Sequence, residues 1–442
     1  MPHMRDNSAI TRITAIVIAV VIIVAAVAVG SYVAFNYLNQ GGQANIPQGI
    51  KIGLLTHRSG SALATGQDIE RGFTLAVDEI NAAGGVYVAQ YGKNLTLIPY
   101  IEDQQSSQQG TIDAANKLIN QDKVDIIVGG FGSAFIYAAQ PTIAQAGVPY
   151  IITGVSTPRV ITRTDIDTSW FVLYQATGIE QGGAISKILA GAVQPVATPN
   201  RHLKIAVLYQ DSPFGQDYFA GLNQTIVQNN LPIDIVYVNK FPVGTTSFQS
   251  LLQAAAATNP DVIVPIGFIG ETVAAIQQGQ SIIQHKIWGP VCTCVDDASY
   301  YKNIGQAGAY TLMETYFGPY SSHPSVRDKV NAFIQKFTAR FGVRPGSQAL
   351  AAYDAVYIAA KAIQQAGSLD KVKIKNTLRT MTIPQLLTPV PGGQIHFGDK
   401  GQQTFLIYGT QLIWNATLGE PRPVIIWPSD IAQANFVPPP GF

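Results

Sequence analysis

The sequence predicts an α/β protein, in which two doubly wound lobes follow an N-terminal transmembrane helix. Three observations support this fold class. A charge-free apolar run occupies residues 13–35. From residue 50 onward, short apolar runs typical of strands alternate with amphipathic patterns typical of helices. This alternation starts again near residue 203, and a chain of 442 residues is long enough to bury the cores of two domains.

The apolar run reads ITAIVIAVVIIVAAVAVGSYVAF, and its length suits the ~20 residues that a helix needs to cross a bilayer. Arg5 and Arg12 precede it, so we expect residues 1–12 to form a cytoplasmic tail and the rest of the chain to lie outside the cytoplasm. A cleaved signal peptide is the alternative, although its apolar region is usually shorter, about 7–15 residues. Residues 36–49 are predicted to form a flexible linker.

The first series of elements forms one predicted α/β lobe. Its strands are apolar on both faces, as in a parallel sheet covered by helices. Strands are predicted at residues 50–55, 95–103, 124–128 and 148–154, and helices at residues 68–83, around 112–119 and from Ser133.

The second series repeats this plan without any short-period sequence repeat. Strands are predicted at residues 203–211, 233–241, 261–268 and 286–291, and helices from Pro213, around 248–257 and at 271–279. Helical patterns return at residues 325–341 and 346–366, and residues 403–416 and 423–428 are predicted to form a terminal hairpin. These late segments could be shared between the lobes.

The sequence lacks the common signatures of enzymes and metal sites. It has no P-loop, and the glycine pattern that ends at Gly132 is an incomplete dinucleotide fingerprint. No G-x-S-x-G motif surrounds Ser133 or Ser156, and the six histidines lack zinc-ligand spacing. The net charge of +1 gives no reason to expect a nucleic acid. We therefore predict no catalytic residue, no metal and no cofactor.

Polar or glycine-rich turns follow several of the predicted strands. In open α/β sheets, ligands bind at the carboxyl ends of the strands, so these turns are candidates for a binding site. They comprise residues 56–60, 131–134, 153–157, 211–215 and 267–271.

Individual residues in these turns also have simpler interpretations. Ser133 begins a predicted helix, where free N–H groups and the helix dipole favour an anion, but it could equally be an N-cap. Ser156 could be an ordinary turn residue, and Arg58 a solvated surface charge. Phe214 and Phe268 could be core aromatics.

The segment IKIGLLTHRSGSALATGQDIERGFTLAVDEINAAGGV resembles the opening of the solute-binding proteins of branched-chain amino acid ABC transporters, the Leu/Ile/Val-binding proteins. Further similar landmarks follow along the chain up to about Gly419. They are AANKLI, VDIIVGG, AGVPYI, STP and KIAVLYQDSPFGQD. The resemblance implies a type I periplasmic-binding-protein fold, with two lobes joined by three hinge crossovers.

The resemblance also implies limits for the parts of the fold. We expect crossovers near residues 172–177, 314–318 and 395–402. The first lobe would then comprise residues 50–174 plus 318–398. The second would comprise residues 175–317 plus 399–442.

By this resemblance the protein is an extracytoplasmic solute receptor of an ABC importer, tethered to the cell membrane by its N-terminal helix. It would capture an amino acid, amide or organic acid and deliver it to the permease subunits. A ligand-sensing receptor ectodomain is the alternative, and an extracellular α/β enzyme is a third possibility.

The resemblance assigns ligand contacts residue by residue. A serine at the position of Ser133 holds the ligand carboxylate in relatives, helped by the backbone at Gly154 and Val155 and by a hydroxyl at Ser156. Phe214 and Phe268 stand where relatives often have tyrosines.

The resemblance leaves two alternatives for the partner of a ligand ammonium. Relatives carry a carboxylate after a Gly-Pro turn, but here VCTC follows that turn. Either Asp297, Asp296 or Glu271 reaches the site, or the ligand is not an α-amino acid, because a buried ammonium without a partner is costly. Arg58 would favour a second acidic group on the ligand.

Overall fold

The computed structural model divides the chain into two units, Met1–Gln48 and Gly49–Phe442, which are described separately. The described residues are 17, 20–21, 23–31, 46–291, 298–316 and 318–442. In the first unit, residues 23–31 are helical, and the rest of the predicted anchor lies largely outside the described residues. None of the described helices has the length and apolar character needed to span a bilayer.

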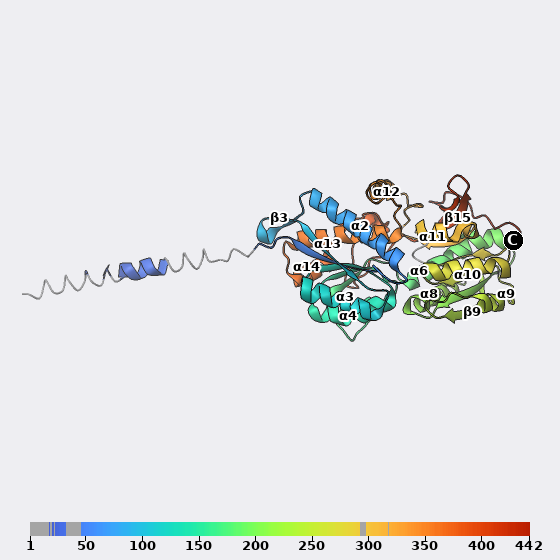
Figure 1. Ribbon diagram of the computed structural model, residues 1–442, viewed down its shortest axis with the longest axis horizontal. Coiled ribbons are helices and arrows are strands. Elements are labelled where there is room, and N and C mark those ends of the chain that lie inside the picture. The colour runs from blue at the N-terminus through green and yellow to red at the C-terminus, as the bar shows by residue number, and fades with distance from the viewer. Residues whose placement is uncertain (1–16, 18–19, 22, 32–45, 292–297, 317) are drawn as a thin grey trace, which may run out of the picture. The chain divides into compact units, whose positions relative to one another are not determined.

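A five-stranded parallel sheet organises the first lobe of the second unit (Figure 1). Its strand order is β4-β1-β5-β6-β7, and it confirms the predicted parallel, helix-covered arrangement. The strands are β1 (Ile50–Thr56), β4 (Leu97–Asp103), β5 (Ile126–Phe131), β6 (Tyr150–Gly154) and β7 (Phe171–Leu173).

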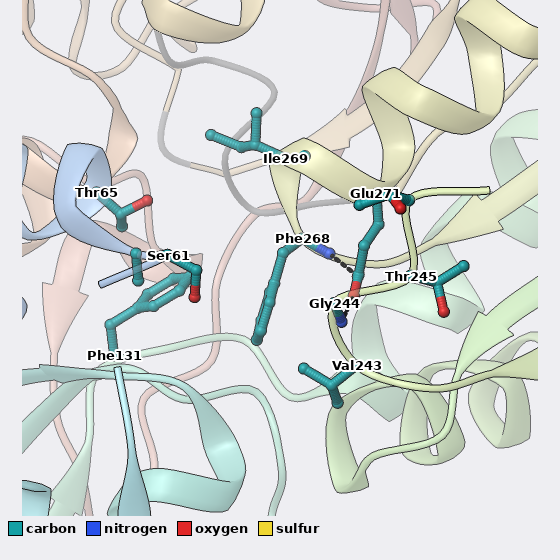
Figure 2. Close-up of a pocket in the computed structure, with 12 residues that line it drawn as sticks. Ser61, Thr65, Phe131, Val243, Gly244, Thr245, Phe268, Ile269 and Glu271 are labelled. Carbon is teal, nitrogen blue, oxygen red and sulfur yellow. Dashed lines mark hydrogen bonds between the residues drawn. The ribbon is translucent and has the colours of Figure 1, made fainter. Parts of the chain in front are cut away.

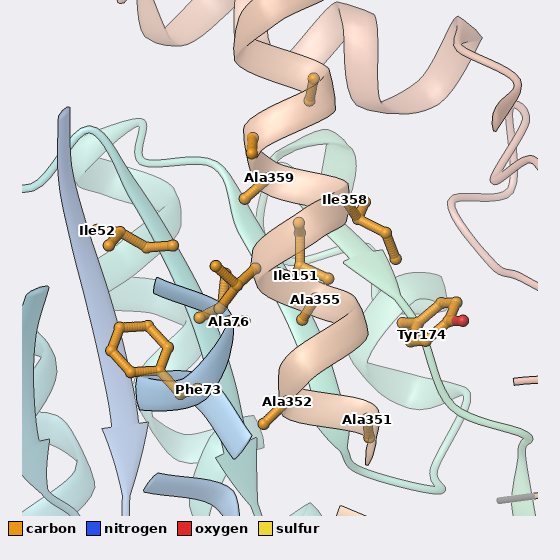
Figure 3. Packing of buried hydrophobic residues seen from close by; sticks show 14 of the residues in the cluster. Ile52, Phe73, Ala76, Ile151, Tyr174, Ala351, Ala352, Ala355, Ile358 and Ala359 are labelled. Carbon is orange, nitrogen blue, oxygen red and sulfur yellow. The ribbon is translucent and has the colours of Figure 1, made fainter. Parts of the chain in front are cut away.

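Helices cover both faces of this sheet. On one face, α2 (Leu63–Ala82) and α13 (Ser347–Ala366) pack on residues such as Ile52 and Ile151 (Figure 3). The other face carries α3 (Gln108–Lys117) and α4 (Ser133–Ala146). The lobe also contains the helices α5 (Arg159–Thr162), α12 (Arg327–Phe341) and α14 (Lys371–Thr380). Two short antiparallel pairs of strands complete it. One pairs β2 (Val86–Val88) with β3 (Lys93–Leu95), and the other pairs β13 (Ile383–Pro384) with β14 (Gln394–Ile395).

The second lobe contains a four-stranded parallel sheet of order β11-β10-β8-β9. One face is covered by α6 and α8, and the other by α9, α10 and α11. The strands are β8 (Leu203–Gln210), β9 (Ile233–Phe241), β10 (Val262–Ile266) and β11 (Ile287–Trp288). The helices are α6 (Gly178–Ile188), α7 (Gln194–Ala197), α8 (Pro213–Gln228), α9 (Gln249–Ala256), α10 (Ile269–Ile282) and α11 (Ala298–Ile304).

The predicted terminal hairpin is confirmed as β15 (Tyr408–Asn415) and β16 (Glu420–Trp427). Together with β12 (Leu312–Thr315) it forms a separate antiparallel sheet of order β12-β15-β16. Leu412 and Ile426 bury their side chains in the cores of the second lobe, so this sheet belongs to that lobe.

Segments that connect the two lobes lie side by side. Leu173, at the end of β7, forms a parallel bridge with Gln402, and its N–H donates to the carbonyl oxygen of Gly401 at 2.7 Å. The ring of Phe405 packs 5.2 Å from that of Tyr174 and 5.0 Å from that of Tyr316, between centroids. The lobe limits given from the sequence stay a prediction.

Helices α2 and α6 are among those that differ from the sequence expectation. Helix α2 begins at Leu63 rather than at Asp68, because the carbonyl of Gly60 accepts the N–H of Leu63 and starts the helix early. Helix α6 was not predicted, because its glycines obscure the apolar periodicity of the segment. A capping box between Thr177 and Glu180 was the available signal for α6.

Candidate functional site

The turn after β5 places Ser133 at the first position of α4. The N-cap is Gly132, whose φ of 91° favours glycine and whose missing side chain leaves space for the ring of Phe135. Ser133 is therefore not the N-cap, and its hydroxyl makes no hydrogen bond to another described residue. Among the described residues, the N–H groups of Ser133 and Ala134 have no backbone acceptor, whereas those of Phe135 and Ile136 donate to the carbonyl oxygen of Gly132 at 3.1 Å. The turn therefore presents two N–H groups and the Ser133 hydroxyl as donors.

Phe131, the last residue of β5, is held firmly by two buried polar side chains. Its N–H donates to Oε1 of Gln104 at 3.1 Å, and its carbonyl oxygen lies 3.1 Å from Nε2 of His57. Nδ1 of His57 accepts the N–H of Ser106, so Nε2 carries the proton of the neutral ring. Burial lowers the pKa of His57, which favours the neutral form of the ring. The Phe131 ring thus forms a fixed wall.

The turn after β6 supplies the adjoining rim. The carbonyl of Gly154 accepts the N–H of Gly132 at 3.0 Å, and a Cβ at Gly154 would lie 2.4 Å from the carbonyl oxygen of Gly130. Only glycine permits this close approach of the two strand ends. Val155 points away from the rim into the apolar cluster around α4 and is fully buried there.

Ser156 lies where the two lobes meet. Its carbonyl oxygen accepts the N–H of Gly178, the first residue of α6, at 2.6 Å. Its hydroxyl accepts Nε2 of Gln181 at 3.3 Å. The rim of the first lobe is therefore in direct polar contact with the second lobe.

A small inner cavity brings five of the predicted residues together. It is lined by Phe131, Gly132, Ser133, Gly154, Ser156, Phe214 and Phe268. Its volume of about 10 Å³ has room for about one water molecule. The ring of Phe268 fills the space, lying 5.7 Å from the ring of Phe131 and stacked 6.3 Å from that of Phe214.

A larger outer cavity of about 270 Å³ lies on the other side of the Phe131 and Phe268 rings, both of which line it (Figure 2). The start of α2 forms one wall and the loop after β9, with the start of α10, forms the other. The remaining lining residues are Ser61, Ala62, Thr65, Val243, Gly244, Thr245, Thr246, Ile269, Gly270 and Glu271. No basic side chain is among the described residues that line either cavity.

Glu271 is the ionisable group of this lining. Its Oε2 accepts the N–H of Phe268 at 2.8 Å (Figure 2). Its Oε1 accepts the N–H of Gly244 at 2.6 Å, and its Oε2 also accepts Nε2 of Gln210 at 2.7 Å. Burial raises the pKa of Glu271 and outweighs these hydrogen bonds, which favour the charged form. Glu271 thus fixes the loop after β9 and places a carboxylate at the wall of the outer cavity.

The family model of periplasmic binding proteins matches residues 49–412 of the chain. This chain belongs to the periplasmic binding protein family. It is 24% identical over 365 residues to the Leu/Ile/Val-binding protein homolog 7 of Brucella abortus (strain 2308), an alignment that covers 78% of this chain and 84% of that relative.

Crystal structures of other proteins share this periplasmic-binding-protein fold. The leucine-binding protein LivK of Thermotoga maritima is 18% identical, with a TM-score of 0.69, and the match covers 86% of this chain and 99% of LivK. A solute-binding protein of an ABC transporter from Rhodopseudomonas palustris BisB5, in complex with 3,4-dihydroxybenzoic acid, is 22% identical, with a TM-score of 0.70 and coverage of 89% and 99%. These likenesses establish the type I fold that the sequence predicted.

Among the described residues, Arg58 is a predicted site residue that, like Val155, does not line the cleft of this periplasmic binding protein. Arg58 is half exposed and forms an ion pair with Glu70 of α2 at 3.0 Å, because the turn after β1 is anchored by the Arg58 N–H to Asp103 and directs the side chain outward. Arg58 borders a separate surface groove. Asp297, like Asp296, lies outside the described residues.

Several residues that line the outer cavity were not predicted from the sequence. Ser61 and Thr65 follow the first predicted turn, but their position at the start of α2 was hidden by the late predicted start of that helix. The loop from Val243 to Thr246 follows β9 without a motif. The glycine at 244, which has a φ of 83°, was the available signal for a tight turn there.

Proposed function

We propose that this protein is an extracytoplasmic solute-binding protein of an ABC importer, and that its two lobes close around a small carboxylate of the amino acid type. The observation that carries the proposal is the polarity of the cleft. Hydrogen-bond donors gather at Ser133, and a carboxylate stands at Glu271 across the Phe268 ring.

The donor end suits the ligand carboxylate. The Ser133 hydroxyl has no partner among the described residues, and it lies beside the free N–H groups at the start of α4, where the helix dipole favours negative charge. The Ser156 hydroxyl and the backbone of Gly154 complete this end of the inner cavity. A carboxylate here would find several donors without needing a basic side chain.

The acceptor end suits the ligand ammonium. Glu271 accepts three N–H groups, and a carboxylate has about four acceptor positions, so one position remains for the ligand. A nearby ammonium favours the charged carboxylate, which offsets part of the burial that raises the pKa of Glu271. Glu271, one of the three acids considered from the sequence, lines the outer cavity, and this supports its pairing with a ligand ammonium.

The lobes must open before a ligand can reach Ser133. The inner cavity holds about one water molecule, so a carboxylate can reach Ser133 only if the ring of Phe268 withdraws with the second lobe. A ligand that contacts both lobes in the closed form then shifts the population toward that form. Relatives whose structures contain isoleucine, 4-hydroxybenzoate and benzoate support a small carboxylate with an apolar body as the ligand class.

Delivery to permease subunits and a retained membrane anchor at residues 13–35 are parts of the same proposal. Support comes from the ABC transporter relatives and from the apolar sequence of that segment. The protein acts by binding and release, without chemical conversion of the ligand. Recovery of the unchanged ligand after prolonged incubation, measured by mass spectrometry, tests that part.

A thermal-shift screen with matched ligands tests the site. Residues 49–442 would be heated with leucine against 4-methylpentanoate and with phenylalanine against 3-phenylpropanoate, which differ in each pair by the ammonium alone. A ligand at 100 times its Kd adds about 2.7 kcal/mol to the free energy of unfolding. We expect at least one amino acid to raise Tm more than its desamino partner.

The screen tests the carboxylate role of Ser133 and the ammonium role of Glu271 separately. Stronger shifts with the desamino compounds would remove the ammonium role of Glu271 and retain the carboxylate role of Ser133. Benzoate and acetamide are included as a carboxylate and an amide without an ammonium. A shift with acetamide and none with any carboxylate would remove the role assigned to Ser133.

A further inference from the structure

We propose that Asp217 is a positioning residue that holds the two lobes closed and thereby sets ligand affinity without touching the ligand. The inference rests on the proposed function, because it assumes that closure of the cleft is what binds the ligand. It concerns a contact beside the cleft, and Asp217 lines neither the inner nor the outer cavity.

The contact joins one side chain of the second lobe to two of the first. Asp217 lies in the second turn of α8, one helical turn after Phe214 of the inner cavity. Its Oδ2 accepts the hydroxyl of Thr157 at 2.5 Å, and its Oδ1 accepts Nη2 of Arg159 at 2.9 Å. Thr157 directly follows Ser156, so the contact fixes the rim that carries a proposed ligand donor.

Because Asp217 is buried, a partly open form in which its carboxylate has lost its donors but is not yet hydrated would be high in free energy. Thr157 is fully buried and Asp217 is 8% exposed, although the Arg159 side chain is half exposed. A buried carboxylate that loses its donors without gaining water is strongly disfavoured. Opening of the cleft must therefore separate the lobes far enough to hydrate Asp217. Closed and open forms are two distinct states rather than a continuous range.

Among the described residues, the Asp217 carboxylate forms no hydrogen bond or ion pair inside its own lobe. Every hydrogen bond and ion pair described for its carboxylate comes from Thr157 or Arg159 of the first lobe. The core contacts of α8 are made by other residues, including Tyr218 and Leu222. Replacing Asp217 should thus leave the second lobe folded and change the balance between the closed and open forms.

The fraction of closed molecules directly affects the measured affinity. The apparent Kd equals the intrinsic Kd divided by the closed fraction, so a contact that favours closure tightens binding of every ligand equally. Loss of a hydrogen bond to a charged group is large enough to weaken binding about tenfold, or about 1.4 kcal/mol. We expect most of this loss of affinity to come from a faster dissociation rate, because the contact resists opening of the lobes.

The first test compares Asp217→Asn with Asp211→Asn in residues 49–442. Asp211 is a matched control because it precedes the same helix and pairs with Lys240 of its own lobe at 2.8 Å. Small-angle X-ray scattering without added ligand reports the opening. We expect Asp217→Asn to increase the radius of gyration and Asp211→Asn to leave it unchanged. Equal radii for Asp217→Asn and the unmodified protein would overturn the proposal.

The second test measures ligand dissociation and keeps the inference separate from the proposed function. With the compound that gives the largest shift among leucine, phenylalanine and their desamino partners, Asp217→Asn should raise Kd about tenfold. If all four compounds fail to bind, the ligand class of the proposed function is wrong, while the scattering still decides the closing role. Unchanged Kd for Asp217→Asn would contradict the inference alone.

A partner variant covers the case in which Asp217→Asn fails to fold. Thr157→Val keeps the shape of the side chain and removes its hydroxyl, so it should open the cleft and raise Kd in the same direction. The effects of Thr157→Val and Asp217→Asn should be strongly non-additive in the double variant, because both break one contact. Additive effects would mean that the two residues act independently, which contradicts the proposal.

Discussion

Ser133 and Ser107 are two serines at helix starts that have different roles. The Ser107 hydroxyl accepts the N–H of Gly110 and caps α3. The Ser133 hydroxyl stands one position later relative to its helix, after the N-cap Gly132, and faces the inner cavity. One position along the chain thus separates a side chain that satisfies its own helix from one that is available to a ligand.

Substitution of these serines separates affinity from stability. We expect Ser133→Ala to weaken binding of a carboxylate ligand by about 1.5–3 kcal/mol, the usual value of a hydrogen bond to a charged group, and to leave Tm unchanged. Ser107→Ala should instead lower the free energy of unfolding by about 1 kcal/mol and leave Kd unchanged. Calorimetric titration measures Kd for each variant, and thermal unfolding measures the stability of each. A lower Tm for Ser133→Ala would show that its hydroxyl is structural.

The raised pKa of Glu271 predicts how amino acid binding depends on pH. The ordinary value is 4.5, and burial places the folded, ligand-free value above it. Glu271 therefore becomes protonated as pH falls through the raised value, and a neutral carboxyl no longer attracts an ammonium. We expect the affinity for the amino acid to fall over this range and the affinity for its desamino partner to change little. Glu271→Gln should remove the difference between the two pH profiles.

As pH falls, Glu271 weakens amino acid binding but increases its contribution to the free energy of unfolding. Between pH 4.5 and the raised value, the folded state holds more protons at Glu271 than the unfolded state does. The contribution of Glu271 to the free energy of unfolding is therefore largest below this range and declines as pH rises through it.

At the scale of elements, α2 and α13 approach each other closely enough to exclude a side chain. A Cβ at Gly72 would lie 2.1 Å from the carbonyl oxygen of Ala349. Asp68, one turn earlier, accepts the N–H groups of Gly346 and Ala349 at the start of α13. A carboxylate at a helix N-terminus also interacts favourably with the dipole of α13. The pair α2 and α13 thus forms the covering layer on one face of the first sheet.

A pair of glycine substitutions tests this packing. Gly72→Ala should destabilise the protein by about 1–3 kcal/mol or more, because backbone atoms must move apart. Gly270→Ala is the matched helical control, since no atom lies within 4 Å of the added Cβ and alanine is the better helix former. Chemical denaturation of both variants gives the comparison. Similar stability of the two would mean that the helices can separate without cost.

Much of the site could be predicted at this scale because parallel strands share one carboxyl edge. The turns that carry Ser133, Gly154 and Ser156 follow β5 and β6, and those of Phe214 and Phe268 follow β8 and β10. A sheet of this kind necessarily gathers such turns.

The rest of the site depends on geometry that apolar patterns do not encode. The direction of Arg58 is set by an anchor to Asp103 and by Glu70, which are distant from it in sequence. The lining loop at Gly244 is held by Glu271, a contact between residues 27 positions apart. Neither pairing has a sequence signature, so only the folded chain reveals them.

At the scale of the whole molecule, the four apolar cores are built from residues after position 49. Removal of residues 1–48 should therefore leave Tm unchanged within about 2 °C and leave ligand binding intact. The full chain should fractionate with membranes, and the shortened chain with the soluble proteins. Sequencing of the mature N-terminus provides the check on the anchor. A mature chain that begins near Gly30 would show that the apolar segment is cleaved.

The bridge between Leu173 and Gln402 has a consequence for how such a protein can diversify. We expect two segments that are hydrogen-bonded together to bend as a unit, which disfavours sliding of one lobe past the other. If the lobes close as in the proposed function, substitutions around the ligand can change the specificity during evolution while the closing motion stays the same.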